Sequence, residues 1–349
     1  MGRKATGRPT SFDIAYAAGV SQPTVSRALR GDRSVSEQTR LKIERIARDL
    51  NYTVDKNASS LRSQRSNTIA LLFFEDPTPD GSMINPFFLA MLGAITRACA
   101  DRRLDLLISF QRMEDDWHVQ YQDSHRADGL ILLGYGDYTA YRQRLDQLEA
   151  QGTHFARWGS VSSDSGGFTI GTDNVQAGRL AGEHLVKHGC RAIAYLGHAD
   201  EHYPEFRGRY EGLTDALRAA DIKPDAALQF DAITTEEAGH DAACRLIDSD
   251  RPFDGIFAAS DLIAIGAMRA LASHGIVVPR DVAVVGFDDI PAASLTTPPL
   301  TTIMQDIKGA GEALVQTLVA QIEDRPMPRR RLPGKLIIRA STGDTAGQG

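Results

Sequence analysis

The residues best suited to recognise something outside the protein lie in one short segment near the N-terminus, GVSQPTVSRALRG (residues 19–31). Pro23 falls in the first turn of a predicted short helix, where its missing N–H has no partner to lose. Short and polar side chains in a first turn add little to a core, but they can enter the major groove of DNA. The side chains that this helix would present to DNA are those of Ser21, Gln22, Pro23, Thr24 and Arg27.

Two further helices are predicted to position this segment. Thr10 and Asp13 fit a capping box that begins the first helix, and Gly19 ends it. The third helix begins after Ser36, and its apolar residues recur at helical spacing. The short link that contains Gly19 joins the first two helices as in a helix-turn-helix motif. We therefore predict a DNA-binding domain over residues 1–52.

The charge of the chain is unevenly distributed. Residues 1–66, the head, contain 13 Lys and Arg against 6 Asp and Glu, whereas the remaining residues contain 26 against 39. A basic head on an acidic body indicates that only the head binds a polyanion. A three-helix domain that binds another protein is the alternative, and it leaves this charge unexplained.

A hinge is predicted over residues 53–66, a polar segment with one prominent apolar side chain, that of Leu61. Two helical turns fit between Asn57 and Gln64, too few to be stable alone in water. We expect this segment to fold on binding. A plain flexible linker is the alternative, but it does not explain a lone leucine in a basic segment.

From Thr68 onward, apolar strands such as TIALLFF, GLILL and VAVVGF alternate with amphipathic helices. This pattern is typical of parallel sheets covered on both faces. Two such sets predict an α/β body, residues 67–342, of two doubly wound subdomains with a ligand cleft at the carboxyl ends of the strands. The expected ranges are 67–167 with 305–330 for the first subdomain, 168–304 with 331–342 for the second, and 343–349 for a polar tail.

Signals for enzymatic chemistry are weak. No G-x-G-x-x-G follows a strand, and neither a P-loop nor a G-x-S-x-G elbow occurs. His184 and His188 are four residues apart, but Glu183 precedes the first histidine, so the zinc motif H-E-x-x-H is absent. Asp288 and Asp289 are adjacent at a strand end and are expected to point apart. We predict no catalytic residue, no metal site and no cofactor.

The compartment is suggested by what the chain lacks. No run of about 18 apolar residues occurs, and the N-terminus has no apolar stretch of the kind found in signal peptides. Cys99, Cys190 and Cys244 are far apart and odd in number, which is typical of reduced core thiols. We predict a cytoplasmic protein with no membrane partner. An exported sugar-binding protein, which the body alone would permit, is the alternative.

Seven motifs occur along nearly the whole chain in the order that they have in one family. The chain thereby resembles the LacI/GalR transcriptional repressors. The motifs are Thr10–Gly31, the segment around Leu61, Asn85-Pro86-Phe87-Phe88, Asp128-Gly129, Arg209–Gly212, Gly286-Phe287-Asp288-Asp289 and Pro299-Leu300-Thr301-Thr302-Ile303. The resemblance implies a homodimer whose heads read the halves of a palindromic operator in double-stranded DNA. It also implies a periplasmic-binding-protein-type body that binds a small effector, and this binding controls how the heads bind the operator.

The resemblance assigns roles to the residues of the head. Gln22 and Pro23 fall at positions that discriminate half-sites, and Leu61 takes the place of a leucine that wedges into the central minor-groove step. The other implied DNA contacts are Ser21, Thr24, Ser26, Arg27 and Ala58. Val54-Asp55 departs from the family's usual Pro-Asn before the hinge. The tail TGDTAGQG has no leucine heptads, which favours a dimer over the family's tetramers.

The resemblance also implies an effector site. Aromatic faces and bidentate polar groups are suited to sugars, so the implied effector is a small carbohydrate. The matching positions are Phe87, Phe88, Asp137, Arg209, Ser260, Asp288 and Gln305. Ser260-Asp261 stands where Asn-Asp is usual, and Thr234 falls near a position that is often aromatic. The floor of the pocket is therefore altered, and no single sugar is implied.

Overall fold

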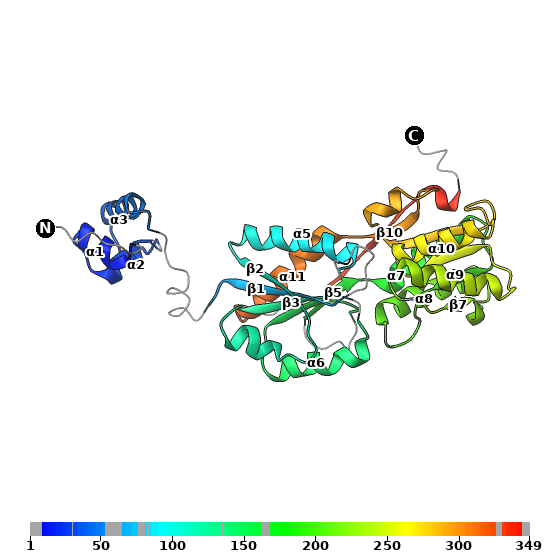
Figure 1. Cartoon of the computed structure of the whole chain (residues 1–349), viewed down its shortest axis with the longest axis horizontal. Coiled ribbons are helices and arrows are strands. Elements are labelled where there is room, and N and C mark those ends of the chain that lie inside the picture. The colour runs from blue at the N-terminus through cyan, green and yellow to red at the C-terminus, as the bar shows by residue number, and fades with distance from the viewer. Residues whose placement is uncertain are drawn as a thin grey trace. The chain divides into compact units, whose positions relative to one another are not determined.

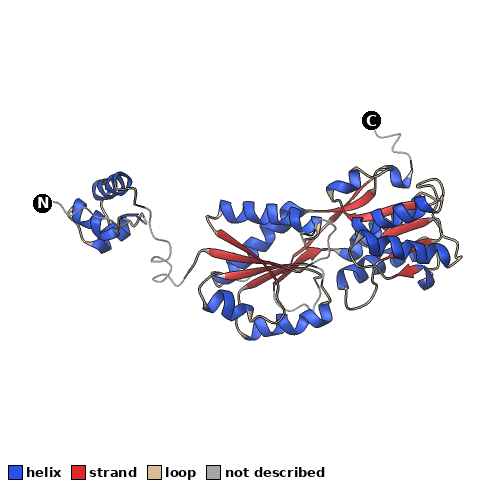
Figure 2. Cartoon of the chain, in the orientation of Figure 1, coloured by secondary structure: helices blue, strands red, loops and turns tan. Residues whose placement is uncertain are grey.

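The computed structural model describes residues 9–29, 31–52, 65–75, 81, 84–134, 136–161, 168–325 and 330–343. By its internal contacts the chain divides into two units, Met1–Ser66 and Asn67–Gly349. Every strand among the described residues lies in the second unit (Figures 1 and 2).

The head contains the three predicted helices, α1 (Ser11–Ala18), α2 (Gln22–Leu29) and α3 (Glu37–Asp49). One small hydrophobic core joins them, and it includes Ile14, Val25 and Ile43.

The predicted capping box is confirmed at the start of α1. The Asp13 carboxylate accepts hydrogen bonds from the Thr10 N–H at 2.7 Å and from the Thr10 hydroxyl at 2.8 Å. These bonds lower the pKa of Asp13. At the other end Gly19 has φ +68°, the left-handed conformation that ends a helix and that a residue with a Cβ rarely adopts. These local interactions set the turn that leads into α2.

The first subdomain of the body is a six-stranded sheet in which every pair is parallel. In spatial order its strands are β11 (Arg330–Leu332), β5 (Phe168–Thr172), β4 (Phe155–Trp158), β3 (Gly129–Leu133), β1 (Thr68–Phe73) and β2 (Asp105–Phe110). Its helices are α5 (Pro86–Asp101), the π-helix η1 (His118–Asp123), α6 (Tyr138–Ala150) and α11 (Ile307–Ile322). Alternate side chains of β1 face opposite layers: Leu71 packs in a core with residues of α5 and α11, and Leu72 packs in a core with residues of α6. Figure 1 shows α5 and α6 on opposite faces of this sheet.

The second subdomain has the same architecture with one difference. Its strand order is β12 (Gly334–Ile337), β10 (Thr301–Gln305), β9 (Ala283–Asp288), β8 (Gly255–Ala258), β6 (Ile193–Leu196) and β7 (Gln229–Phe230). The edge strand β12 is antiparallel to β10, and all other pairs are parallel. Its α-helices are α7 (Asn174–Lys187), α8 (Pro204–Ala219), α9 (Glu236–Asp248) and α10 (Asp261–Ser273). Its 3-10 turns are η2 (Ala226–Leu228), η3 (Pro291–Ser294) and η4 (Ala340–Thr342).

The chain crosses between the subdomains three times, and the first crossing corrects a predicted boundary. The prediction begins the second subdomain at residue 168, but β5 pairs with β4 in the first sheet, so the crossing follows Thr172. The later crossings follow Gln305 and Leu332. The backbone hydrogen bonds of β5 to β4 place this strand in the first sheet. The last residues of the expected tail, 344–349, lie outside the described residues.

Two helices of the second subdomain approach each other unusually closely. A Cβ on Gly178 of α7 would lie 2.1 Å from the carbonyl oxygen of Arg209, and one on Gly212 of α8 would lie 2.0 Å from that of Val175. Only glycine at both positions lets the backbones of α7 and α8 approach this closely. The contact sets the start of α7 against the side chain of Arg209, which is central to the site.

Other predictions can be compared with the described residues. No helix among them is long and apolar enough to cross a membrane, and no cluster of His, Cys, Asp or Glu is arranged for a metal ion. The His184 imidazole is buried and hydrogen-bonds the Thr342 hydroxyl at 2.8 Å, which gives this histidine a structural role. Burial lowers the pKa of His184 to about 4. Cys99 and Cys190 are buried thiols, as predicted, and Cys244 is half-buried.

Candidate DNA-binding helix and ligand cleft

The α2 helix divides into a core face and a polar face. Val25 and Ala28 are buried in the core of the head. Of the predicted contact residues, Ser21, Pro23 and Arg27 are exposed, and Gln22, Thr24 and Ser26 are half-buried. Ser26 and Arg27 follow Gln22 and Pro23 by one helical turn, so these four residues share one side of the helix.

Two hydrogen bonds order the first turn of α2. The Gln22 amide donates to the Ser11 hydroxyl of α1 at 3.2 Å, and the Ser21 and Thr24 hydroxyls lie 2.8 Å apart. Gln22 is therefore held by one long hydrogen bond at a half-buried position. The predicted contacts Ala58 and Leu61 lie outside the described residues.

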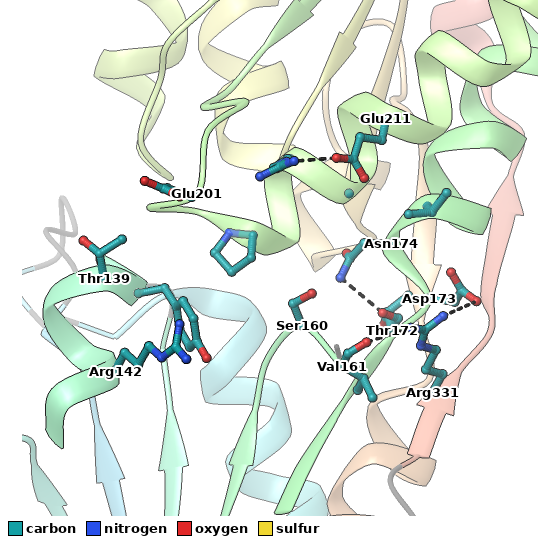
Figure 3. Close-up of a pocket in the computed structure, with 15 residues that line it drawn as sticks. Thr139, Arg142, Ser160, Val161, Thr172, Asp173, Asn174, Glu201, Glu211 and Arg331 are labelled. Atoms are coloured by element: carbon teal, nitrogen blue, oxygen red, sulfur yellow. Dashed lines mark hydrogen bonds and ion pairs between the residues drawn. The ribbon is translucent and has the colours of Figure 1, made fainter. Parts of the chain in front are cut away.

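The body contains a cavity of about 550 Å³ between its subdomains, which we call the outer cavity. Its walls come from the start of α6, the end of β4, the β5–α7 crossing and the start of α8 (Figure 3). Cavities of roughly 300–1,000 Å³ at the carboxyl ends of parallel strands suit small ligands. Figure 3 shows Thr139 and Arg142 on one side, Glu201 and Glu211 on the other, and Asn174 at the crossing.

Three predicted effector residues meet in a buried network beside the outer cavity. Gln305 donates to the Asp288 carboxylate at 2.6 Å and accepts from the Thr172 hydroxyl at 2.5 Å. Arg209 donates through Nε to the Asn174 amide oxygen at 2.9 Å. Thr172 and Asn174 also line the outer cavity, so they connect it to the network.

The electrostatics of the network centre on Asp288 and Arg209. Burial raises the pKa of Asp288 to about 7, against the opposing effects of the Arg209 charge and the Gln305 hydrogen bond. The Arg209 guanidinium lies 3.6 Å from the centre of the Phe287 ring and donates to the carbonyl of Ala259. The arginine is fully buried, and its bond to Asn174 links it to a residue that lines the outer cavity.

Asp137 bridges the two subdomains. Its carboxylate caps α6 by accepting from the Thr139 N–H and hydroxyl, and it lies 2.9 Å from Nδ1 of His202. The Tyr138 N–H also donates to the carbonyl of His202 at 2.8 Å. The hydrogen bonds, above all that from the Thr139 hydroxyl, lower the pKa of Asp137 to about 2, and the bond to Asp137 raises the pKa of His202. The pair therefore holds the two sides of the cleft mouth together.

None of the seven predicted effector positions is among the residues that line the outer cavity, and three of them lie in the interior of the body. Phe87 and Phe88 are 1% exposed and pack in the hydrophobic core, where the Phe87 ring lies 6.0 Å from that of Trp158. Ser260 is fully buried, and its hydroxyl caps α10 by accepting from the Ile263 N–H at 3.3 Å. Their apolar neighbours and cap geometry keep these residues behind the wall. Their role as effector contacts stays a prediction.

Sequence reasoning named none of the residues that line the outer cavity. Thr172-Asp173-Asn174 carried a usable signal, because polar residues directly after an apolar strand mark the strand's carboxyl end. Arg142, Glu201 and Arg331 carried none, since each is an exposed charged residue with no motif around it. The expectation for the Asp288-Asp289 pair is confirmed: Asp289 binds Arg339 at 2.6 Å, while Asp288 binds Gln305.

Two family models match this chain. The model of bacterial regulatory proteins of the lacI family matches residues 12–55, which include α2. The model of a periplasmic binding protein-like domain matches residues 183–342, within the body.

Complete relatives and solved structures are similar over nearly the whole chain. The ribose operon repressor of Escherichia coli (strain K12) is 30% identical over 328 residues, 93% of this chain and 96% of the relative. The lac repressor dimer bound to operator and the anti-inducer ONPF has a TM-score of 0.80 and 26% identity, over 97% of this chain and 100% of that one. A complex of the transcriptional regulator CelR with cellobiose has a TM-score of 0.71 and 28% identity, over 96% and 100%.

Proposed function

Because the chain belongs to the LacI family of bacterial regulatory proteins, we propose that it is a sequence-specific DNA-binding transcriptional repressor controlled by a small carbohydrate. The observation that carries the proposal is the joining, in one chain, of a three-helix unit with a polar recognition helix and a body with a ligand-sized cavity. The protein acts in the cytoplasm, where its operator is found, and the chemistry of both sites is binding, not catalysis.

In the proposed DNA complex the chain is a homodimer, and the α2 helix of each copy enters the major groove of one half of a palindromic operator. Gln22 and Pro23 contact base edges, and the neighbouring polar side chains of α2 contact bases and phosphates. The hinge, residues 53–66, lies in the minor groove, where Ala58 contacts the DNA and Leu61 wedges between base pairs. The similarity to the lac repressor dimer bound to operator supports this arrangement.

The proposed effector occupies the outer cavity. Thr172 and Asn174 transmit its presence to Gln305, Arg209 and Asp288. Binding changes the affinity for DNA only because the ligand prefers one arrangement of the two subdomains over the other. The cellobiose in the CelR structure and the polar lining of this cavity support a carbohydrate as the effector.

An operator-selection experiment with the full chain tests the proposal. Gln22→Ala should weaken binding by about 1–3 kcal/mol and relax the preference at one position in each half-site. The matched control is Gln38→Ala, which removes an exposed glutamine from α3. If the Gln22 variant selects the wild-type site with unchanged affinity, α2 is not the recognition helix. Titrations of the selected operator with and without sugars then test the response to effector.

A further inference from the structure

A second, much smaller cavity of about 20 Å³ adjoins the outer cavity, and Tyr138 lines both. We call it the inner cavity. Its polar lining comes from Gln111 at the end of β2, Tyr141 on α6, Arg157 in β4 and Glu205 on α8. A space of this size holds about one oxygen-sized group, since a water needs roughly 10–15 Å³ by the same measure.

Two buried polar atoms on this wall have no hydrogen-bond partner. One is Nη2 of Arg157, whose side chain is 5% exposed; its Nε donates to the Thr169 hydroxyl at 3.0 Å. The other is Oε1 of Gln111, which is 7% exposed. The Gln111 Nε2 donates to the carbonyls of Leu72 and Leu133 at 2.9 and 3.2 Å, and this fixes the amide so that Oε1 is the atom left over.

An unpaired donor and an unpaired acceptor on one small cavity specify the group that fits between them. Leaving buried polar atoms unpaired costs stability, so a donor and an acceptor left unpaired on the same cavity call for a group that pairs with both. A methyl group would satisfy neither Arg157 nor Gln111. A carboxylate would accept from Arg157 but cannot donate to Gln111, and it would face the buried carboxylate of Glu205. A hydroxyl both accepts and donates, and it carries no charge.

We propose that the inner cavity is a hydroxyl-selective subsite in which Arg157 donates to, and Gln111 accepts from, one hydroxyl of the carbohydrate effector. This inference rests on the proposed function, because it assumes a sugar in the adjoining outer cavity. Arg157 and Gln111 are then the residues that distinguish a sugar from its deoxy analogue at that one carbon. The Tyr138 ring, whose centre lies 4.9 Å from the Arg157 guanidinium, stands between the two cavities and beside the bound sugar.

The test measures sugar binding to the full chain by isothermal titration calorimetry. The probes are D-ribose, D-glucose and cellobiose, followed by every monodeoxy analogue of the tightest binder. For wild type, the analogue that lacks the buried hydroxyl should bind at least about 100-fold more weakly than its parent, because both orphan atoms stay unpaired. Arg157→Lys keeps the positive charge and removes Nη2. In this variant the ratio of the affinity for the parent sugar to that for the deoxy analogue should fall below about tenfold.

Arg144→Lys is the matched control. It makes the same substitution on α6 at a residue that does not line the inner cavity, so the wild-type ratio should be retained. Thermal melts of each variant establish that it is folded. If Arg157→Lys does not fold, the wild-type series alone decides the question.

The outcomes separate the subsite from the proposed function. If wild type binds a sugar and every monodeoxy analogue binds within about tenfold of it, the inner cavity holds a buried water only, and the subsite is refuted. The same conclusion follows if Arg157→Lys keeps the full ratio. In either case the carbohydrate response stands. If wild type binds none of the three sugars, the proposed carbohydrate response fails and the subsite fails with it.

Discussion

Replacing Arg209 by alanine should destabilise the body far more than a substitution at the rim of the cleft. The change removes the donors to the Asn174 amide oxygen and to the Ala259 carbonyl, together with the contact with the Phe287 ring. It also removes the positive charge that opposes the effect of burial on the Asp288 carboxyl. The alanine variant therefore leaves a buried acid without its cation and two buried acceptors with fewer donors.

The expected size of the effect follows from the complete burial of the side chain. Leaving a buried acceptor without its donor costs about 1–3 kcal/mol, and this change removes two such donors together with a neighbouring charge, so we expect a loss of about 3–5 kcal/mol. The losses are not simply additive because the groups form one network. For a body of this size the loss corresponds to a fall in melting temperature of about 6–15 °C.

Thermal unfolding followed by circular dichroism measures the effect, with Arg207→Ala as the matched control. Arg207 lies on the same helix, is about half exposed and pairs with Glu211 at 2.9 Å. Such surface pairs contribute about 0–1 kcal/mol. If the melting temperatures of the two variants agree within about 2 °C, the reasoning that Arg209 is a structural cation is refuted. A loss of effector response in Arg209→Ala is then interpretable only at temperatures where the variant is folded.

Burial raises the pKa of the Asp288 carboxyl from 3.8 to about 7. The stability that the protonated carboxyl contributes is therefore complete below pH 4 and is lost as pH rises through 7. Over this window the melting temperature of Asp288→Asn should fall less than that of wild type. The bond to Asp137 raises the pKa of His202 above 6.5. As pH rises above the raised pKa, His202 loses its proton and the pair that holds the cleft mouth together weakens, so wild-type sugar affinity should fall. His202→Ala should abolish this dependence in calorimetric titrations, and an unchanged pH profile would contradict the bridge. Leu61→Ser should reduce the bend of operator DNA in a gel-shift phasing assay while nonspecific binding stays nearly constant. Equal bends in both proteins would rule out the wedge.

The sequence by itself determined the head and the architecture of the body. Capping at Thr10 and Asp13 and the left-handed turn at Gly19 depend on residues within a few positions of one another, so their types suffice to predict them. The alternation of apolar strands and amphipathic helices likewise reflects local periodicity, which is why the two sheets were predicted correctly. The polar face of α2 followed from the same spacing.

Only the tertiary structure decided which side chains meet at the cleft. Asp137 and His202 are 65 residues apart, and Thr172 and Gln305 are 133 apart, so no local pattern reveals either pair. The sheet that β5 joins depends on hydrogen bonds to β4, not on its composition, and the burial of Phe87 depends on how α5 packs over the sheet. In the sequence, Arg157 is an ordinary charged residue in an apolar strand. Only the packing of β2, α6 and α8 around it makes it part of the inner cavity. Residue types that are close together in the chain determine the helices and strands. Strand pairing and packing between elements far apart in the chain determine which residues form the site.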